Sequence, residues 1–119
     1  GYNNTASGYN ALFANTSGFN NTAFGHRTLE STTNGSGNTA IGQGALTNNT
    51  LGTNNTAIGS GAGPSITYPS LPNTTAIGNG AIVTTSNEMR LGNASVTAVR
   101  TSGTVYVNGV ALTSDSRLK

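Results

Sequence analysis

A short motif with one large apolar position repeats along the first part of the chain. In its clearest copies it reads Asn-Thr-Ala, then Phe or Ile, then Gly, and the first four copies are spaced by 17 residues. The copies begin at Asn4, Asn21, Asn38 and Asn55, with a fifth at Thr74 and a degenerate sixth at Glu88. A fixed period of this length is typical of a solenoid in which each repeat forms one coil.

Each repeat predicts two short extended segments joined by turns that contain glycine. In the third repeat these segments are residues 38–41 and 45–47, with Gly42 and Gly44 between them. Stacked coils pair strand over strand at about 4.8 Å, so five to six coils would form a rod of roughly 25–30 Å. We therefore expect residues 1–92 to form stacked parallel coils.

The alternation of side chains along a strand predicts two different faces. Thr39 and Ile41 share one face, and Ala40 lies on the other. We expect the large residues to face the coil interior, namely Ile41, Ile58, Ile77 and Leu46. The small alanines are then free to pack closely against a neighbouring protomer: Ala6, Ala23, Ala40, Ala57 and Ala76.

The composition explains why a neighbouring protomer is expected. Only 34% of the 119 residues are hydrophobic and 7% are charged. Disordered chains combine low hydrophobicity with high charge, and the high charge is missing here. Each coil offers only one or two large apolar side chains, which is too few for a stable core in a single chain. Association of several copies is therefore expected.

The run Asn-Thr-Ala-Ile-Gly followed by Ala-Leu, at residues 38–46, resembles known fibre repeats. It is similar to the head repeats of trimeric autotransporter adhesins and, more closely, to repeats of bacterial and phage tail-fibre-domain proteins. The resemblance covers residues 1–92 and implies a left-handed parallel β-roll (a β-solenoid) in which three chains associate around one axis. The 17-residue step departs from the shorter step common in adhesin heads, so the resemblance does not fix the exact coil geometry.

An insertion between the fourth and fifth repeats, residues 63–72, contains all 3 prolines of the chain. Proline cannot donate a hydrogen bond to a strand ladder, so we expect this segment to bulge outward as a loop. Its apolar residues Ile66, Tyr68 and Leu71 are candidates for binding a partner, with packing over the roll as the alternative.

The repeat stops after Gly92, and residues 93–113 predict a β-rich neck. Residues 96–99 and 104–107 are expected to be strands, and the turn pair Asn108-Gly109 follows the second one. With residues 110–112 this segment predicts either a hairpin or an intertwined neck in which three chains exchange strands.

The last six residues, 114–119, read Ser-Asp-Ser-Arg-Leu-Lys. They resemble the opening of the intramolecular chaperone domain of endosialidase-type tailspikes and tail fibres. The resemblance implies a self-cleaving dyad in which Ser114 attacks the carbonyl of Thr113 and Lys119 activates the serine, with Asp115 and Arg117 completing the motif. A lysine whose ammonium group is desolvated can serve as such a base.

Charge and titratable residues exclude several other functions. The formal net charge of +2 comes from scattered basic residues, so a nucleic-acid-binding stripe is not expected. The chain has no cysteine, and no apolar run is long enough to span a membrane. His26 lies in a tolerant turn column, and the carboxylates Glu30, Glu88 and Asp115 are far apart. We expect no metal, no cofactor and no turnover of an external substrate.

The sequence therefore predicts a structural, extracellular fibre segment of a phage tail fibre, an injection-system fibre or a bacterial surface adhesin, located on a virion tail or a bacterial cell surface. Its expected partners are two further copies of the chain and a cell-surface glycan or protein receptor. One alternative is a self-cleaving assembly module that cuts once between Thr113 and Ser114. A remote alternative is an ice-binding solenoid with ordered threonine columns, which is disfavoured if Thr39 shares the interior face with Ile41.

Overall fold

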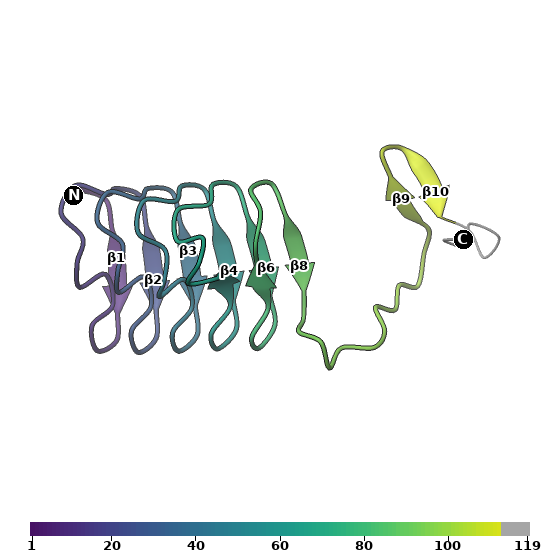
Figure 1. Ribbon diagram of the computed structural model, residues 1–119, viewed down its shortest axis with the longest axis horizontal. Helices are drawn as coiled ribbons and strands as arrows, with labels where there is room; N and C mark the ends of the chain where they lie inside the picture. Colours follow the sequence, from purple (N-terminus) through teal and green to yellow (C-terminus); the bar gives the residue numbers. More distant parts are fainter. Residues whose placement is uncertain (113–119) are drawn as a thin grey trace.

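The computed structural model describes residues 1–112 and consists of a solenoid followed by a hairpin (Figure 1). Six strands, one from each coil, form a parallel sheet in the order β1-β2-β3-β4-β6-β8. They are β1 (Thr5–Ser7), β2 (Thr22–Phe24), β3 (Thr39–Ile41), β4 (Thr56–Ile58), β6 (Thr75–Ile77) and β8 (Met89–Leu91). The all-β solenoid with coils of about 17 residues is confirmed.

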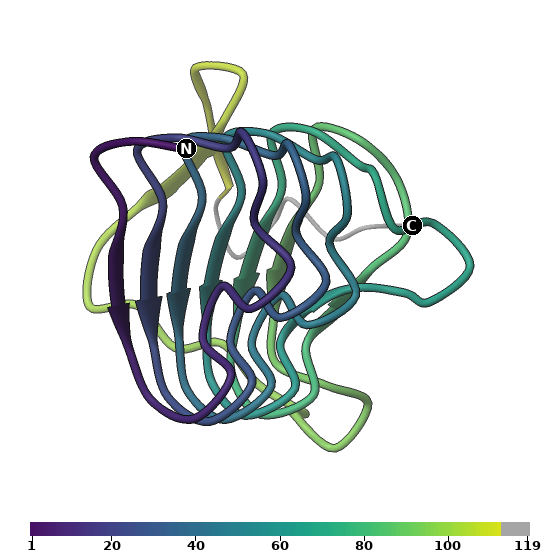
Figure 2. The same cartoon turned by 90° about the vertical axis from the view of Figure 1, so that its left-hand side faces the viewer.

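The strands stack in the register of the repeat. Ala40 lies beside Ala57, and Ile41 lies beside Ile58. The register survives the longer fourth coil, because Ala57 still pairs with Ala76. The extra residues are thus accommodated outside the sheet, and the end-on view shows the coils superposed with a loop projecting from one of them (Figure 2).

The predicted orientation of the strand faces is wrong. The alanines of β2, β3, β4 and β6 are buried, whereas Phe24, Ile41, Ile58 and Ile77 point outward and are 39–45% exposed. Strand alternation fixes which residues share a face but does not say which face is inside. The coil is narrow, and only the small alanine fits between the sheet and the opposite wall.

Leucines fill the core from that opposite wall, and the prediction that Leu46 faces inward is confirmed. Leu12, Leu29 and Leu46 are buried in one cluster with the strand alanines. The second extended segment predicted at residues 45–47 is wrong, because this part of the coil forms turns. All three leucines have positive φ, between 50° and 55°. This conformation costs roughly 1–2 kcal/mol per residue, and burial of a leucine side chain, worth about 1.5–3 kcal/mol, offsets it.

A buried asparagine ladder connects the coils beside the sheet. The side-chain oxygen of Asn21 accepts the backbone N–H of Asn38 at 3.0 Å, and Asn38 accepts that of Asn55 at 2.9 Å. Each amide nitrogen also donates across the coil, as from Asn38 to the carbonyl of Gly52 at 2.9 Å. The asparagine of the repeat thus supplies hydrogen bonds to backbone groups that water cannot reach.

The insertion is only partly a loop. Gly63 and Pro64 form β5 (Gly63–Pro64), which is buried and pairs in parallel with β7 (Ile82–Val83). Proline is tolerated there because the ladder bonds come from its neighbours: Gly63 N–H donates to Ala81, and Ser65 N–H donates to Val83. The expected outward loop therefore begins at Ser65.

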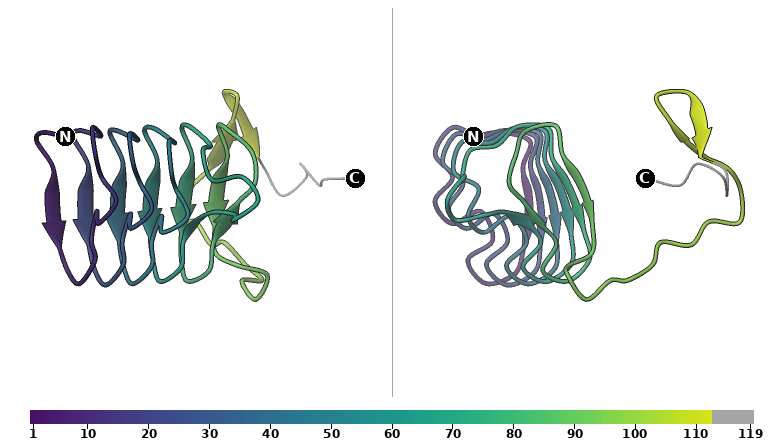
Figure 3. Two further views of the ribbon diagram at one scale, coloured as in Figure 1. Left: turned by 60° about the vertical axis from the view of Figure 1, so that its left-hand side comes forward. Right: turned by 45° about the vertical axis from the view of Figure 1, so that its right-hand side comes forward.

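Beyond the last coil, the chain forms the antiparallel hairpin of β9 (Val105–Val107) and β10 (Val110–Leu112). Asn108 and Gly109 both have positive φ, as a tight two-residue hairpin turn requires. Residues 93–104 lead from the solenoid to this hairpin (Figure 3). The strand predicted at residues 96–99 is wrong, because these residues pair with no other strand.

Candidate binding surfaces

The outer face of the six-stranded sheet carries an unbroken apolar row. It consists of Phe24, Ile41, Ile58, Ile77 and Leu91, which are 39–47% exposed although each is flanked by its neighbours in the stack. A parallel row of half-buried threonines shares this face: Thr22, Thr39, Thr56 and Thr75. We call these two rows the outer sheet face. A continuous exposed apolar surface of this kind is typical of an interaction site.

The loop of residues 65–72 contains the three residues predicted to bind a partner, and their environments differ. Ile66 is 79% exposed and Tyr68 is also exposed. Leu71 instead packs against the buried core, so it supports the loop. A turn is closed by the N–H of Tyr68, which donates to the carbonyl of Ser65 at 2.9 Å.

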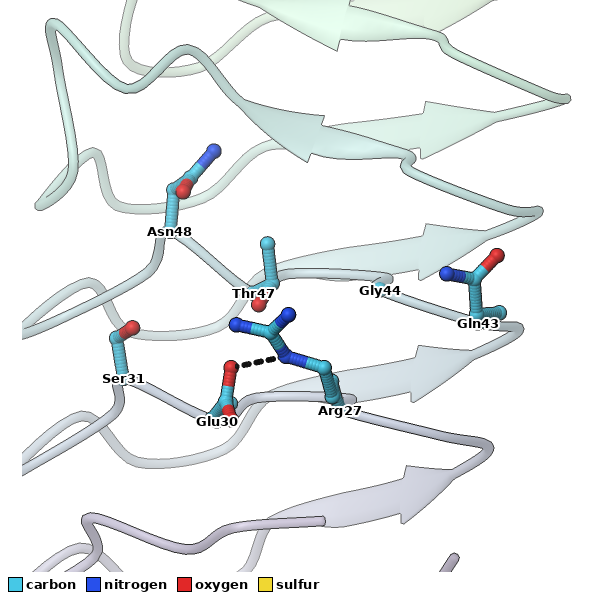
Figure 4. Close-up of a pocket in the computed structure, with 7 residues that line it drawn as sticks. All are labelled: Arg27, Glu30, Ser31, Gln43, Gly44, Thr47 and Asn48. Atoms are coloured by element: carbon cyan, nitrogen blue, oxygen red, sulfur yellow. Dashed lines mark hydrogen bonds and ion pairs between the residues drawn. The ribbon is translucent and has the colours of Figure 1, made fainter. Parts of the chain in front are cut away.

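A polar hollow of about 240 Å³ lies on the turns that follow β2 and β3 (Figure 4). Its lining comes from two successive coils, with Arg27, Glu30 and Ser31 in one and residues 43–44 and 47–48 in the next. The sequence interpretation missed this site because it treated the basic residues as isolated. The spacing of three between Arg27 and Glu30 was the available signal.

Arg27 and Glu30 form an ion pair at the base of the hollow. The Nε of Arg27 donates to Glu30 Oε2 at 2.7 Å, and the amide of Asn10 donates to Oε1 at 3.1 Å. The hydrogen bond from Arg27 is the main reason why the pKa of Glu30 lies below its ordinary value of 4.5. Both carboxylate oxygens are therefore occupied, and Glu30 stays ionised at neutral pH.

Aromatic residues stack between the first two coils. The rings of Tyr2 and Phe19 are stacked nearly parallel with centroids 5.0 Å apart, and Tyr9 stacks on His26 at 5.5 Å. His26 is exposed, as expected for its turn column. Phe24 occupies the column of Ile41 and, like it, projects from the outer sheet face.

The proposed cleavage residues Thr113, Ser114, Asp115, Arg117 and Lys119 lie outside the described residues. Within residues 1–112, no group of three or more His, Cys, Asp or Glu side chains could hold a metal ion. In the same part of the chain, no helix is long and apolar enough to cross a membrane. Comparison with protein-family models, curated proteins and solved structures finds no match.

Proposed function

We propose that this chain is a structural segment of a homotrimeric extracellular fibre that contributes to attachment to a cell surface. The observation that carries the proposal is the outer sheet face, where a large apolar side chain from each of five successive strands is exposed in register. Soluble monomers rarely expose such a row without covering it. The covering surface in the proposal is the same face of two other copies around a three-fold axis.

The rotation axis runs parallel to the stack of coils in this arrangement. Because rotational symmetry keeps equivalent residues at the same height, each isoleucine meets the equivalent isoleucines of the other chains. The parallel, in-register rows suit that contact along the whole sheet. The left-handed roll and the intertwined neck implied by the fibre resemblance belong to this proposal, and the hairpin of β9 and β10 supplies strands for the neck.

The test is the mass of the chain in solution by sedimentation equilibrium. The proposal predicts three times the 11.9 kDa of one chain, and it predicts that the double variant Ile41→Asp/Ile58→Asp sediments as a monomer with an unchanged β-type circular dichroism spectrum. Charges on this face are incompatible with a desolvated contact but are tolerated in water. A wild-type chain that stays monomeric and folded at micromolar concentration would contradict the proposal.

Ice binding is a second candidate because the expectation that Thr39 faces the interior is wrong. Thr39 does share a face with Ile41, but that face is on the outside, and the threonine row is regular from Thr22 to Thr75. The adjacent row of large apolar side chains favours a protein contact over ice. A thermal-hysteresis measurement on the wild-type chain distinguishes the two candidates. Assembly covers the threonine row and predicts no activity, whereas ice binding needs an exposed row and predicts activity.

The self-cleaving module remains a further proposal, supported only by the resemblance of residues 114–119. It predicts that the longest gene product containing this chain is cut between Thr113 and Ser114. Mass spectrometry of the wild type, Ser114→Ala and Lys119→Ala tests it. Cleavage that is as efficient in either variant as in the wild type would exclude the dyad.

A further inference from the structure

The polar hollow between the second and third coils exists because equivalent positions in these coils carry residues of different size. Arg27 and Gly44 occupy equivalent positions and both have positive φ, 59° and 69°. A Cβ placed on Gly44 would find only one backbone atom within reach, the nitrogen of Gly61 at 4.0 Å. The long side chain of Arg27 thus lies below an open space in the next coil.

The groups that line this space are rich in free hydrogen-bond donors. Figure 4 shows the terminal nitrogens of Arg27 on the side of the guanidinium that faces Thr47. Within residues 1–112 these nitrogens form no hydrogen bond, since only Nε contacts Glu30. The oxygen of the Gln43 amide accepts from Ser60, which leaves its NH₂ group available.

The carboxylate of Glu30 does not offer a free acceptor to a ligand in the hollow. Both of its oxygens already accept hydrogen bonds, and the side chain is 17% exposed compared with 55% for Arg27. A guanidinium edge with two free nitrogens matches the two oxygens of a carboxylate. The hollow is therefore complementary to an acceptor-rich, anionic group.

The other residues that line the hollow, together with its volume, indicate what the ligand carries besides its anionic group. The hydroxyl of Thr47 and the amide of Asn48 border the hollow and can both donate to and accept from ligand hydroxyls. The volume of about 240 Å³ is below the range of roughly 300–1,000 Å³ typical of sites for drug-sized molecules. One sugar ring fits this scale better than an extended chain.

We propose that the hollow binds a single carboxylated sugar unit, with the sugar carboxylate on the free nitrogens of Arg27 and the ring hydroxyls at Thr47 and Asn48. Uronic acids and sialic acids share this chemistry. The proposal builds on the attachment function proposed above by naming a class of receptor group. Its residues lie on the turns after the strands, so they remain separate from the outer sheet face.

The experiment is a titration of the ¹⁵N-labelled chain with glucuronate, with N-acetylneuraminate and with uncharged glucose, followed by NMR at constant ionic strength. We expect one or both acids to shift the amide signals of Gly44, Thr47 and Asn48 at ligand concentrations of about 1–10 mM, as for a dissociation constant in the millimolar range. Glucose is expected to leave them unchanged. The acid that binds identifies the source of the carboxylate.

Four variants locate the site. Arg27→Gln is expected to weaken binding about tenfold or more, because a charge-assisted hydrogen bond is lost. Gly44→Asn places a side chain in the hollow and is expected to abolish binding. Its matched control, Gly61→Asn, makes the same change in the next coil, where a Cβ meets nothing within 4 Å, and should bind like the wild type. Asparagine suits both positions because it tolerates positive φ.

Glu30→Gln gives the most specific result. Removing the negative charge beside Arg27 is expected to tighten binding of the acid by about two- to fivefold. No shift with either acid, equal shifts with glucose, or unchanged binding by Gly44→Asn would overturn the proposal. Each of these failures leaves the assembly proposal standing, because sedimentation tests a different face.

Discussion

Replacing Asn38 by alanine removes the centre of the asparagine ladder. The backbone N–H of Asn55 loses Asn38 Oδ1, its hydrogen-bond acceptor, and becomes a buried unsatisfied donor. The side-chain amide also loses its hydrogen bonds to Asn21 at 3.1 Å and to the carbonyl of Gly52. That carbonyl keeps a second bond, from Asn49 at 3.1 Å, so it is not left without a partner.

The expected destabilisation follows from the hydrogen bonds that Asn38→Ala removes. An unsatisfied buried donor costs about 1–3 kcal/mol, and each lost amide hydrogen bond adds a net contribution of about 0.5–1.5 kcal/mol. Because the bonds are coupled, we expect the free energy of unfolding to fall by roughly 2–4 kcal/mol in total. Domains are typically stable by about 5–15 kcal/mol, so this is a large fraction.

Chemical denaturation followed by circular dichroism measures this change. The protein concentration must be equal for all variants, since association would add to the apparent stability. Asn48→Ala is the matched control because Asn48 lies in the adjoining turn and its side chain forms no hydrogen bond within residues 1–112. A difference between the two variants of less than about 0.5 kcal/mol, the ordinary range for surface substitutions, would refute the reasoning.

Three further predictions concern the core, a close contact and pH. Ala40→Leu overpacks the interior and should destabilise the fold by about 1–3 kcal/mol in the same denaturation assay, whereas Ile41→Leu on the outer face keeps the side-chain volume and should cost less. Gly35→Ala places a Cβ 2.6 Å from the carbonyl oxygen of Gly52 and should lower the thermal midpoint; an unchanged midpoint would show that the coils separate easily. The pKa of Glu30 is lowered by Arg27, and that of Glu88 is lowered mainly by the N–H groups of Thr84 and Thr85, so their stabilisation is full at neutral pH and is lost as pH falls below 4.5. Glu88→Gln should flatten the acid side of the stability profile, and a profile identical to the wild type would contradict this.

The repeat period predicts the stacking because coils of equal length bring identical residues side by side in neighbouring strands. The alternation pattern alone does not predict which face of the strands is inside the coil. One signal was present in the column of Ile41, which also contains Ser7 and Phe24. A close-packed interior does not accept three side chains of such different volume, whereas an outer surface does.

The turns explain the remaining differences between the predicted and observed fold. Leucine with positive φ is rare, so the pattern around Leu46 predicted a strand where the chain in fact reverses direction. The ion pair of Arg27 and Glu30 could be inferred from their spacing. The hollow above it could not, because it depends on the orientation of the Arg27 side chain and on the open space that the structure leaves at Gly44.

The proposed fibre requires that the outer sheet face is covered by other copies of the chain. The chain has no cysteine, so a single cysteine at Ile58 provides a direct test by mild oxidation and mass analysis under denaturing conditions. Three-fold association predicts rapid disulfide-linked pairs for Ile58→Cys and none at the same protein concentration for Ser31→Cys, which lies at the polar hollow. Failure of Ile58→Cys to cross-link, or equal cross-linking at both positions, would contradict the claim.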